Sequence, residues 1–142
     1  MPVPYEIVWC RFPFAPQLGE PGPYPRPALV RSTAIGVDNV GEVEVVYGTT
    51  TLKLDKRFYD LIVSKMSEMD ACGLYRATRF DLDQTVWLPW NTDWFEVRSG
   101  FFSPVIGKLT DSMIRWLEVS MSYKKRAQLA ATKEPKLDFD KD

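Results

Sequence analysis

Residues 42–47 read EVEVVY, and this short stretch decides the fold class. Its glutamates occupy alternate positions, so Val43, Val45 and Tyr47 share the opposite face of an extended chain. A period of two is typical of a half-buried strand in an antiparallel sheet. The stretch therefore predicts a mainly β protein.

Similar aromatic and β-branched runs, bounded by proline or glycine, lie on both sides of this stretch. They predict strands at 7–12, 27–32, 78–82, 85–88 and, more briefly, 95–97, with a short apolar stretch at 61–63. Residues 64–71 predict a short helix that Ser64 caps and Gly73 ends. A small antiparallel barrel hides the edges of such strands economically.

A second helix is expected from Asp111, with Thr110 as its cap. Its apolar stripe, which should pack on the barrel, consists of Met113, Trp116, Leu117 and Met121. Residues 1–123 thus form one barrel domain with a C-terminal helix. Residues 124–142 are expected to be a charged, flexible tail in which the basic cluster 124–126 is a solvated helix end.

Composition removes several functions. The chain has 142 residues, a net charge of -1 and no histidine, so catalytic triads, histidine metal ligands and a histidine pH switch are excluded. Cys10 and Cys72 have no CxxC partner, which predicts free thiols and no metal site. No apolar run of membrane-spanning length and no signal peptide is present, so we expect a cytoplasmic protein without cofactors.

The segment Pro13–Pro25 carries five prolines and two glycines. Such a long, stiff loop in a small domain is typically functional, and we expect it to form one wall of a binding groove.

Three motifs together resemble the MazF/PemK (Kid) family of toxin endoribonucleases. They are RPALV at 26–30 after the proline-rich loop, YGTT at 47–50 and GLYRATRF at 73–80. The likeness covers roughly residues 5–120. It implies an SH3-like barrel, usually a homodimer, that cuts single-stranded RNA and is silenced by an antitoxin peptide lying across its RNA groove. It also implies chemistry without histidine, in which the ribose 2′-hydroxyl attacks the adjacent phosphate and an arginine stabilises the developing charge.

The resemblance implies catalytic roles for Arg26, Thr49 and Arg76, and Thr50 as an RNA contact. Arg79 is a further expected RNA contact, and a shift of register could transfer the catalytic role of Arg76 to it. Each residue has a simpler alternative: Arg26 could brace the loop, the threonines could stabilise a turn, and both Arg76 and Arg79 could be surface charges of a strand.

The acid and base are less well matched. Glu20 lies on the loop where several relatives carry a glutamate, so it is the expected general base, although a glutamate in such a loop is usually only solvated. Thr78 is an expected RNA contact. It lies two positions after Arg76, where those relatives that use a carboxylate have aspartate. Asp81 is the nearest replacement as general acid.

Tryptophans at 87, 90 and 94 form an aromatic cluster. Trp90 is the candidate for stacking an RNA base, whereas core or dimer contacts explain most of these rings. Two functions therefore stay open: a metal-independent endoribonuclease of a toxin–antitoxin pair, or a barrel of the same descent that has lost cleavage and binds protein or nucleic acid.

Overall fold

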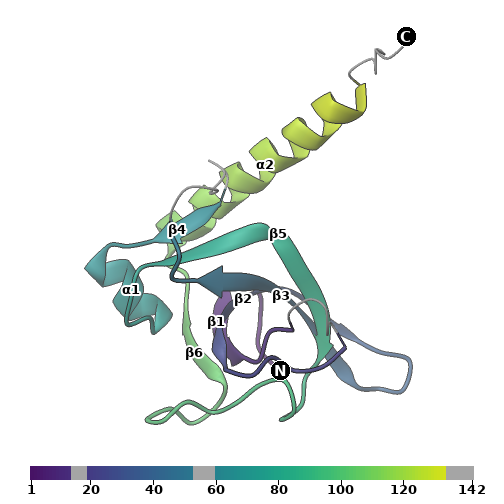
Figure 1. Cartoon of the computed structure of the whole chain (residues 1–142), viewed down its shortest axis with the longest axis vertical. Coiled ribbons are helices and arrows are strands. Elements are labelled where there is room, and N and C mark those ends of the chain that lie inside the picture. Colours follow the sequence, from purple (N-terminus) through teal and green to yellow (C-terminus); the bar gives the residue numbers. More distant parts are fainter. Residues whose placement is uncertain (14–18, 53–59, 134–142) are drawn as a thin grey trace.

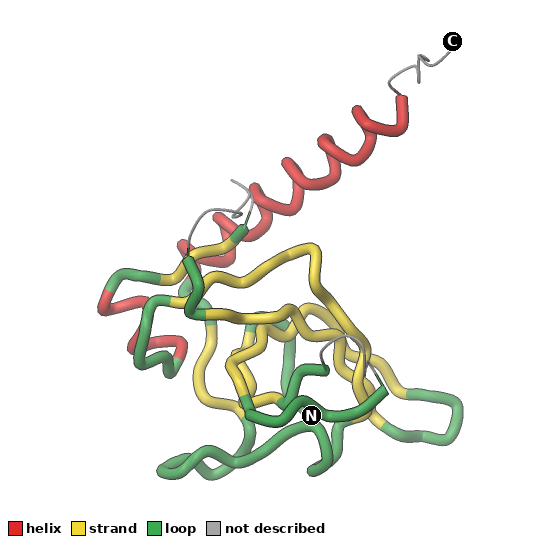
Figure 2. The backbone as a smooth tube through the Cα atoms, in the orientation of Figure 1, coloured by secondary structure: helices red, strands yellow, loops and turns green. Residues whose placement is uncertain are grey.

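A computed structural model, which describes residues 1–13, 19–52 and 60–133, contains one curled antiparallel sheet and two helices (Figure 1). In chain order the elements are β1 (Glu6–Cys10), β2 (Arg26–Ile35), β3 (Gly41–Thr49), β4 (Leu61–Val63), α1 (Met66–Cys72), β5 (Thr78–Pro89), β6 (Val105–Lys108) and α2 (Asp111–Lys133). The strand order β4-β5-β3-β2-β1-β6 curls into a half-barrel (Figure 2). The predicted class, a mainly β small barrel with a short helix and a C-terminal helix, is confirmed.

The sheet is buried on both faces at its centre. Adjacent residues of one strand enter opposite cores: Ile7 and Val46 lie in the first, and Val8 and Val45 lie in the second. The expected half-buried pattern is therefore incomplete, because Val46 is fully buried on the face it was expected to share with glutamates. Full burial of such a side chain stabilises the fold by about 1.5–3 kcal/mol.

The two helices cover the edge strands. Helix α1 packs against β6, and α2 packs against β4. In α2, Met113 and Leu117 are buried in the first core, as predicted, but Trp116 is 46% exposed. The prediction for Trp116 is wrong because the buried face continues through Ser120 instead.

Helix α2 begins as expected and ends later. The Met113 amide donates to Thr110 Oγ1 at 3.3 Å, which confirms the cap. The boundary expected after Tyr123 falls inside the helix, which continues to Lys133 and extends beyond the other elements (Figure 1). Lys124 is not a simple solvated end, since its Nζ donates to the Leu82 carbonyl at 2.6 Å. Residues 134–142 lie outside the described residues.

Helix α1 starts two residues later than predicted. Lys65 is its N-cap and makes no capping bond through its side chain, so the capping role expected for Ser64 is wrong. Its end is as predicted: Gly73 has φ 71°, and a Cβ there would lie 2.0 Å from the Ile106 carbonyl oxygen. Only glycine fits this left-handed position against β6.

The strands predicted at 78–82 and 85–88 are one bent strand, β5. Val46 pairs with Thr85 and Tyr47 pairs with Asp81, so the residues between them form a bulge. Asp81 holds this bulge by accepting bonds from the Asp83 amide at 3.0 Å and from Gln84 Nε2 at 2.9 Å. The polar break read from the sequence is thus a bend rather than a strand end.

The short strand predicted at 95–97 is also wrong, because Phe95 makes only an isolated bridge with Cys10. The sixth strand is β6, which pairs with β1. Cys10 and Cys72 are free, as expected, and the structure shows that both are buried. Within the described ranges, no helix is long and apolar enough to cross a membrane.

Candidate functional site

The antiparallel order brings four strand ends to one end of the sheet. Because β5, β3, β2 and β1 are neighbours, the start of β5, the end of β3, the start of β2 and the end of β1 lie together. The register of the strands shows which residues lie opposite one another at this end: Cys10 pairs with Arg26, and Thr49 pairs with Arg79. Motifs far apart in the sequence therefore meet at this end.

A first hollow lies where β2 begins and β3 ends. It holds about 140 Å³ and is lined by Pro25, Arg26, Pro27, Gly48, Thr49, Thr50 and Thr78. Gly48 is required here, since a Cβ would lie 2.5 Å from the Pro27 carbonyl oxygen and 2.9 Å from the Phe80 ring. The last residue of the proline-rich loop thus contributes to one wall, while its residues 14–18 lie outside the described residues.

A second hollow of about 190 Å³ adjoins the first. The two share Pro27, Thr50 and Thr78. The second adds Trp9, Leu74, Tyr75, Arg76 and Arg98. We call the combined surface the arginine groove.

The groove is cationic although the chain as a whole is not. Arg26, Arg76 and Arg98 line it, and none of its described lining residues is acidic. A local cluster of this kind binds anions without a strongly basic protein. Arginine is the side chain best suited to hold two oxygens of one phosphate.

Two threonine hydroxyls of the groove are already oriented. Thr49 Oγ1 accepts from the Thr51 amide at 3.1 Å, and Thr78 Oγ1 donates to the Arg76 carbonyl at 3.0 Å. In the described parts of the chain no acceptor takes the Thr49 hydroxyl proton, so it can be donated to a ligand oxygen. Thr78, by contrast, offers a ligand only its lone pairs.

Arg26 is held from one side by an aromatic ring. Its guanidinium lies 5.9 Å from the centroid of Tyr47, whose ring packs at 5.2 Å from Phe12. A cation over an aromatic face is attracted by the ring, which helps to position it.

Arg79 lies behind the groove and not in it. It is buried, its Nη1 lies 3.0 Å from Asp60 Oδ2 and 3.7 Å from Asp81 Oδ2, and its Nε donates to the Thr51 carbonyl at 3.2 Å. Arg76, three residues earlier, is exposed. Of the two arginines between which the sequence left the choice open, Arg76 is the one that faces the groove.

Two other expected residues lie elsewhere. Glu20 is exposed and does not line the groove. Asp81 is buried and engaged by Arg79 and the β5 bulge. The described loop residues near Glu20 are tied to Arg11, whose Nη1 donates to the carbonyls of Gly22 at 3.1 Å and Pro23 at 2.8 Å.

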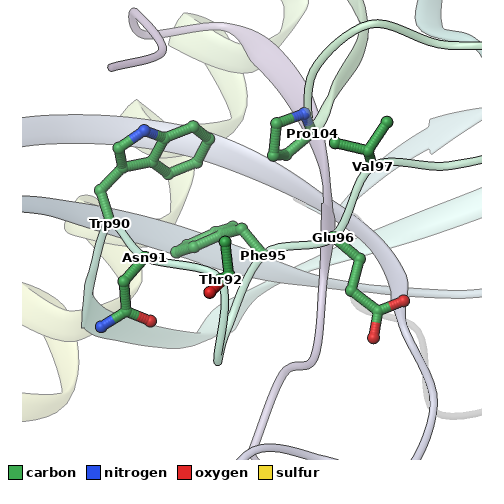
Figure 3. A pocket seen from close by; sticks show the side chains of 7 residues that line it. All are labelled: Trp90, Asn91, Thr92, Phe95, Glu96, Val97 and Pro104. Carbon is green, nitrogen blue, oxygen red and sulfur yellow. The ribbon is translucent and has the colours of Figure 1, made fainter.

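Trp90 lines a separate hollow, the aromatic pocket, of about 520 Å³. Its lining is Trp90, Asn91, Thr92, Phe95, Glu96, Val97 and Pro104. Figure 3 shows the rings of Trp90, Phe95 and Pro104 together, while the polar ends of Asn91 and Glu96 point away from them. Glu96 forms an ion pair with Arg11. None of these residues belongs to the arginine groove.

Among the groove residues, Trp9, Tyr75 and Arg98 were not predicted from the sequence. The Arg98 guanidinium lies 3.9 Å from the Tyr75 ring centroid, 4.9 Å from Trp9 and 5.1 Å from Phe101. One signal for Tyr75 was present, since an aromatic residue directly precedes Arg76. Nothing local marks Arg98, which is brought to the groove by the chain after Trp94.

No family model matches the sequence, and no curated protein matches it.

Proposed function

We propose that this protein is an endoribonuclease that cuts single-stranded RNA, as the MazF/PemK-like toxin of a toxin–antitoxin pair. One observation carries the proposal: Arg26, Thr49, Thr50 and Arg76, which the resemblance names, line one cationic groove together with Thr78. They come from three separate stretches of the sequence, at the start of β2, the end of β3 and the start of β5, so sequence proximity does not explain why the three stretches meet.

In the proposed reaction the 2′-hydroxyl oxygen attacks the adjacent phosphorus. A bond to phosphorus forms, the bond to the 5′-oxygen breaks, and the products are a 2′,3′-cyclic phosphate and a 5′-hydroxyl end. Arg76 holds the phosphoryl oxygens as their charge grows, and Thr49 donates its hydroxyl proton to one of them. Solvent accepts the 2′-hydroxyl proton and returns one to the leaving oxygen, because the described lining residues include no acid.

The test is cleavage of a long mixed-sequence RNA in the presence of EDTA. We expect discrete new 5′ ends that polynucleotide kinase labels without prior phosphatase treatment, since they carry a hydroxyl. The Arg76→Ala protein, prepared in parallel, controls for contaminating nuclease. Absence of cleavage by a large excess of the folded protein would contradict the proposal.

One observation favours a second function, a binding module without cleavage. Glu20 does not line the groove, and Asp81 is engaged elsewhere, so neither expected acid–base residue faces the substrate position. A barrel of this kind binds single-stranded RNA in the same groove and releases it intact. Equilibrium binding of RNA by the protein, with no change in the length of the RNA, would identify this second function.

Two partners follow from the proposed function. An antitoxin segment occupies the arginine groove and competes with RNA, using acidic side chains against Arg26 and Arg76. The protein is also proposed to act as a homodimer. Light scattering tests this directly, because a mass near the 16.4 kDa of one chain contradicts it.

A further inference from the structure

Tyr75 stands out among the groove residues because its ring is both fixed and open. The side chain is 80% exposed, although its neighbour Leu74 is buried in the first core. The Leu74 amide also donates to the Met69 carbonyl at 2.9 Å, which fixes the backbone just before Tyr75. Exposure of this ring therefore does not come from a loose chain.

One face of the ring rests on a buried cation. The Arg98 guanidinium lies 3.9 Å from the Tyr75 centroid, and Arg98 is only 8% exposed. Its Nη1 donates to the Gly73 carbonyl at 2.9 Å, while its Nη2 is buried and has no hydrogen-bond partner among the described residues. A buried unpartnered donor lowers stability, so packing alone is a poor reason for this arrangement.

The contacts divide the ring into two faces. The face against Arg98 is occupied by the cation, and Trp9 and Phe101 enclose that cation further. The high exposure of Tyr75 leaves the other face to solvent. A pre-oriented aromatic face next to positive charge is the arrangement that stacks nucleobases in single-strand-binding proteins.

The surrounding groups match the rest of a nucleotide. Arg76 follows Tyr75 directly, and the hydroxyl-bearing Thr50 and Thr78 line the same hollow. The first hollow, with Arg26 and Thr49, shares Pro27, Thr50 and Thr78 with this one. An aromatic face and groups that can bind phosphate thus line one groove.

We infer that Tyr75 is a base-stacking platform for single-stranded RNA, and that Arg98 is a positioning residue that fixes its ring. This inference rests on the proposed RNA-binding function and adds to it a specific contact. The base that stacks on Tyr75 belongs to the nucleotide whose phosphate meets Arg76. Stacking of this kind selects unpaired over paired RNA, because a base in a duplex has no free face.

The experiment uses the full-length protein and short single-stranded deoxyoligonucleotides, which lack the attacking 2′-hydroxyl and stay intact. Each carries one 2-aminopurine, whose fluorescence falls when it stacks on an aromatic ring. We expect quenching at one register with the parent protein and with Tyr75→Phe. Tyr75→Ala and Tyr75→Leu should lose this quenching and bind about tenfold more weakly.

Phe102 provides the matched control. It is a fully exposed aromatic residue that lines neither the arginine groove nor the aromatic pocket. Phe102→Ala should bind and quench like the parent protein. If Tyr75→Ala quenches and binds like the parent while Arg76→Ala loses binding, the platform is wrong and the RNA-binding groove stands. If the parent protein binds no oligonucleotide and cuts no RNA, both proposals are wrong.

A double-mutant comparison tests the role of Arg98. Arg98→Met should weaken binding in the parent background and cause no further loss in the Tyr75→Ala background, because it acts through Tyr75. Thermal melting checks that each variant is folded. If Arg98→Met does not fold, Arg98→Lys replaces it in both backgrounds. Equal losses in both backgrounds would overturn the positioning role.

Discussion

The arginine groove and the aromatic pocket are hollows of the same half-barrel, but they are built from different material. The groove is the smaller, with parts of about 140 and 190 Å³ against about 520 Å³, and its charged residues include the exposed Arg76. The lining of the pocket includes Phe95, which is buried in the second core. The ring centroids of Phe95 and Trp90 are 4.6 Å apart.

The difference lies in what each set of side chains does for stability. Trp90 and Phe95 gain free energy by packing on the core, so their hollow is a consequence of folding. Tyr75 and Arg76 are exposed and bury little, so the fold has no need of them there. For the site proposed above, volume is therefore a poor criterion, and exposed residues that add nothing to the core are the better candidates. Substitutions should separate the two regions accordingly.

The largest effect is expected behind the groove, at Arg79. Arg79→Ala removes the guanidinium that pairs with the buried carboxylates of Asp60 and Asp81, which should lower the free energy of unfolding by about 3–5 kcal/mol. Urea denaturation measures the loss. A change below about 1 kcal/mol would mean that Arg79 is not the structural arginine of the pair.

The next effect is expected at Arg76, in cleavage and not in stability. Arg76→Ala should lower the cleavage rate about a hundredfold, the usual cost of removing one such donor, and leave the melting temperature unchanged. Arg76→Lys should restore part of the rate, because it keeps the charge and loses the two-pronged geometry. Full activity of Arg76→Ala would remove this residue from the proposed site.

At Trp90 the expected pattern is reversed. Trp90→Ala should lower the free energy of unfolding by about 1–3 kcal/mol, because the ring packs on Phe95. Cleavage per folded molecule should stay within a factor of about two, because Trp90 does not line the arginine groove. A large fall in rate requires the loss of a contact to the transition state. A large fall in cleavage without loss of stability would place RNA in the aromatic pocket instead.

The smallest effect concerns the two buried thiols. Burial raises the pKa of Cys10 far above its usual range, and burial, followed by the nearby Glu68, raises the pKa of Cys72 to about 12. The folded thiols stay neutral, whereas the unfolded ones ionise above about pH 8.5, so stability is complete below that pH and falls above it. At pH 9 the loss should be under about 1 kcal/mol for each thiol.

Thiol labelling extends this test to the pocket. Cys10 forms an isolated β-bridge with Phe95 through the backbone, and both residues belong to the second core. Opening of the aromatic pocket would therefore expose Cys10. We expect iodoacetamide to leave both thiols unmodified in the native protein and to label both in urea. Rapid native labelling of Cys10 would show that the pocket is not a rigid part of the core. Cys72→Ala, which keeps Cys10, assigns the signal.

The sequence contained the local features of this fold. Period-two alternation identified β3, Thr110 predicted the start of α2, and Gly73 predicted the end of α1, because each depends on a few neighbouring residues. The break predicted between 82 and 85 was wrong because these polar residues are satisfied within a bulge: Asp81 accepts from the Asp83 amide and from the Gln84 side chain, and the Asp83 carboxylate pairs with Lys124. Polarity alone does not distinguish a strand end from a bend.

What the sequence by itself determined was the β class, the start of α2, the end of α1 and the identity of residues worth testing, since these follow from backbone preference and short-range hydrogen bonds. Only the tertiary structure decided which of them face one another. Arg76 and Arg79 are three residues apart, yet one is exposed in the groove and the other is paired with Asp60 in the interior. Trp9, Tyr75 and Arg98 meet because antiparallel pairing and packing join distant segments, and a charge is buried only where its partner has been brought by the rest of the chain.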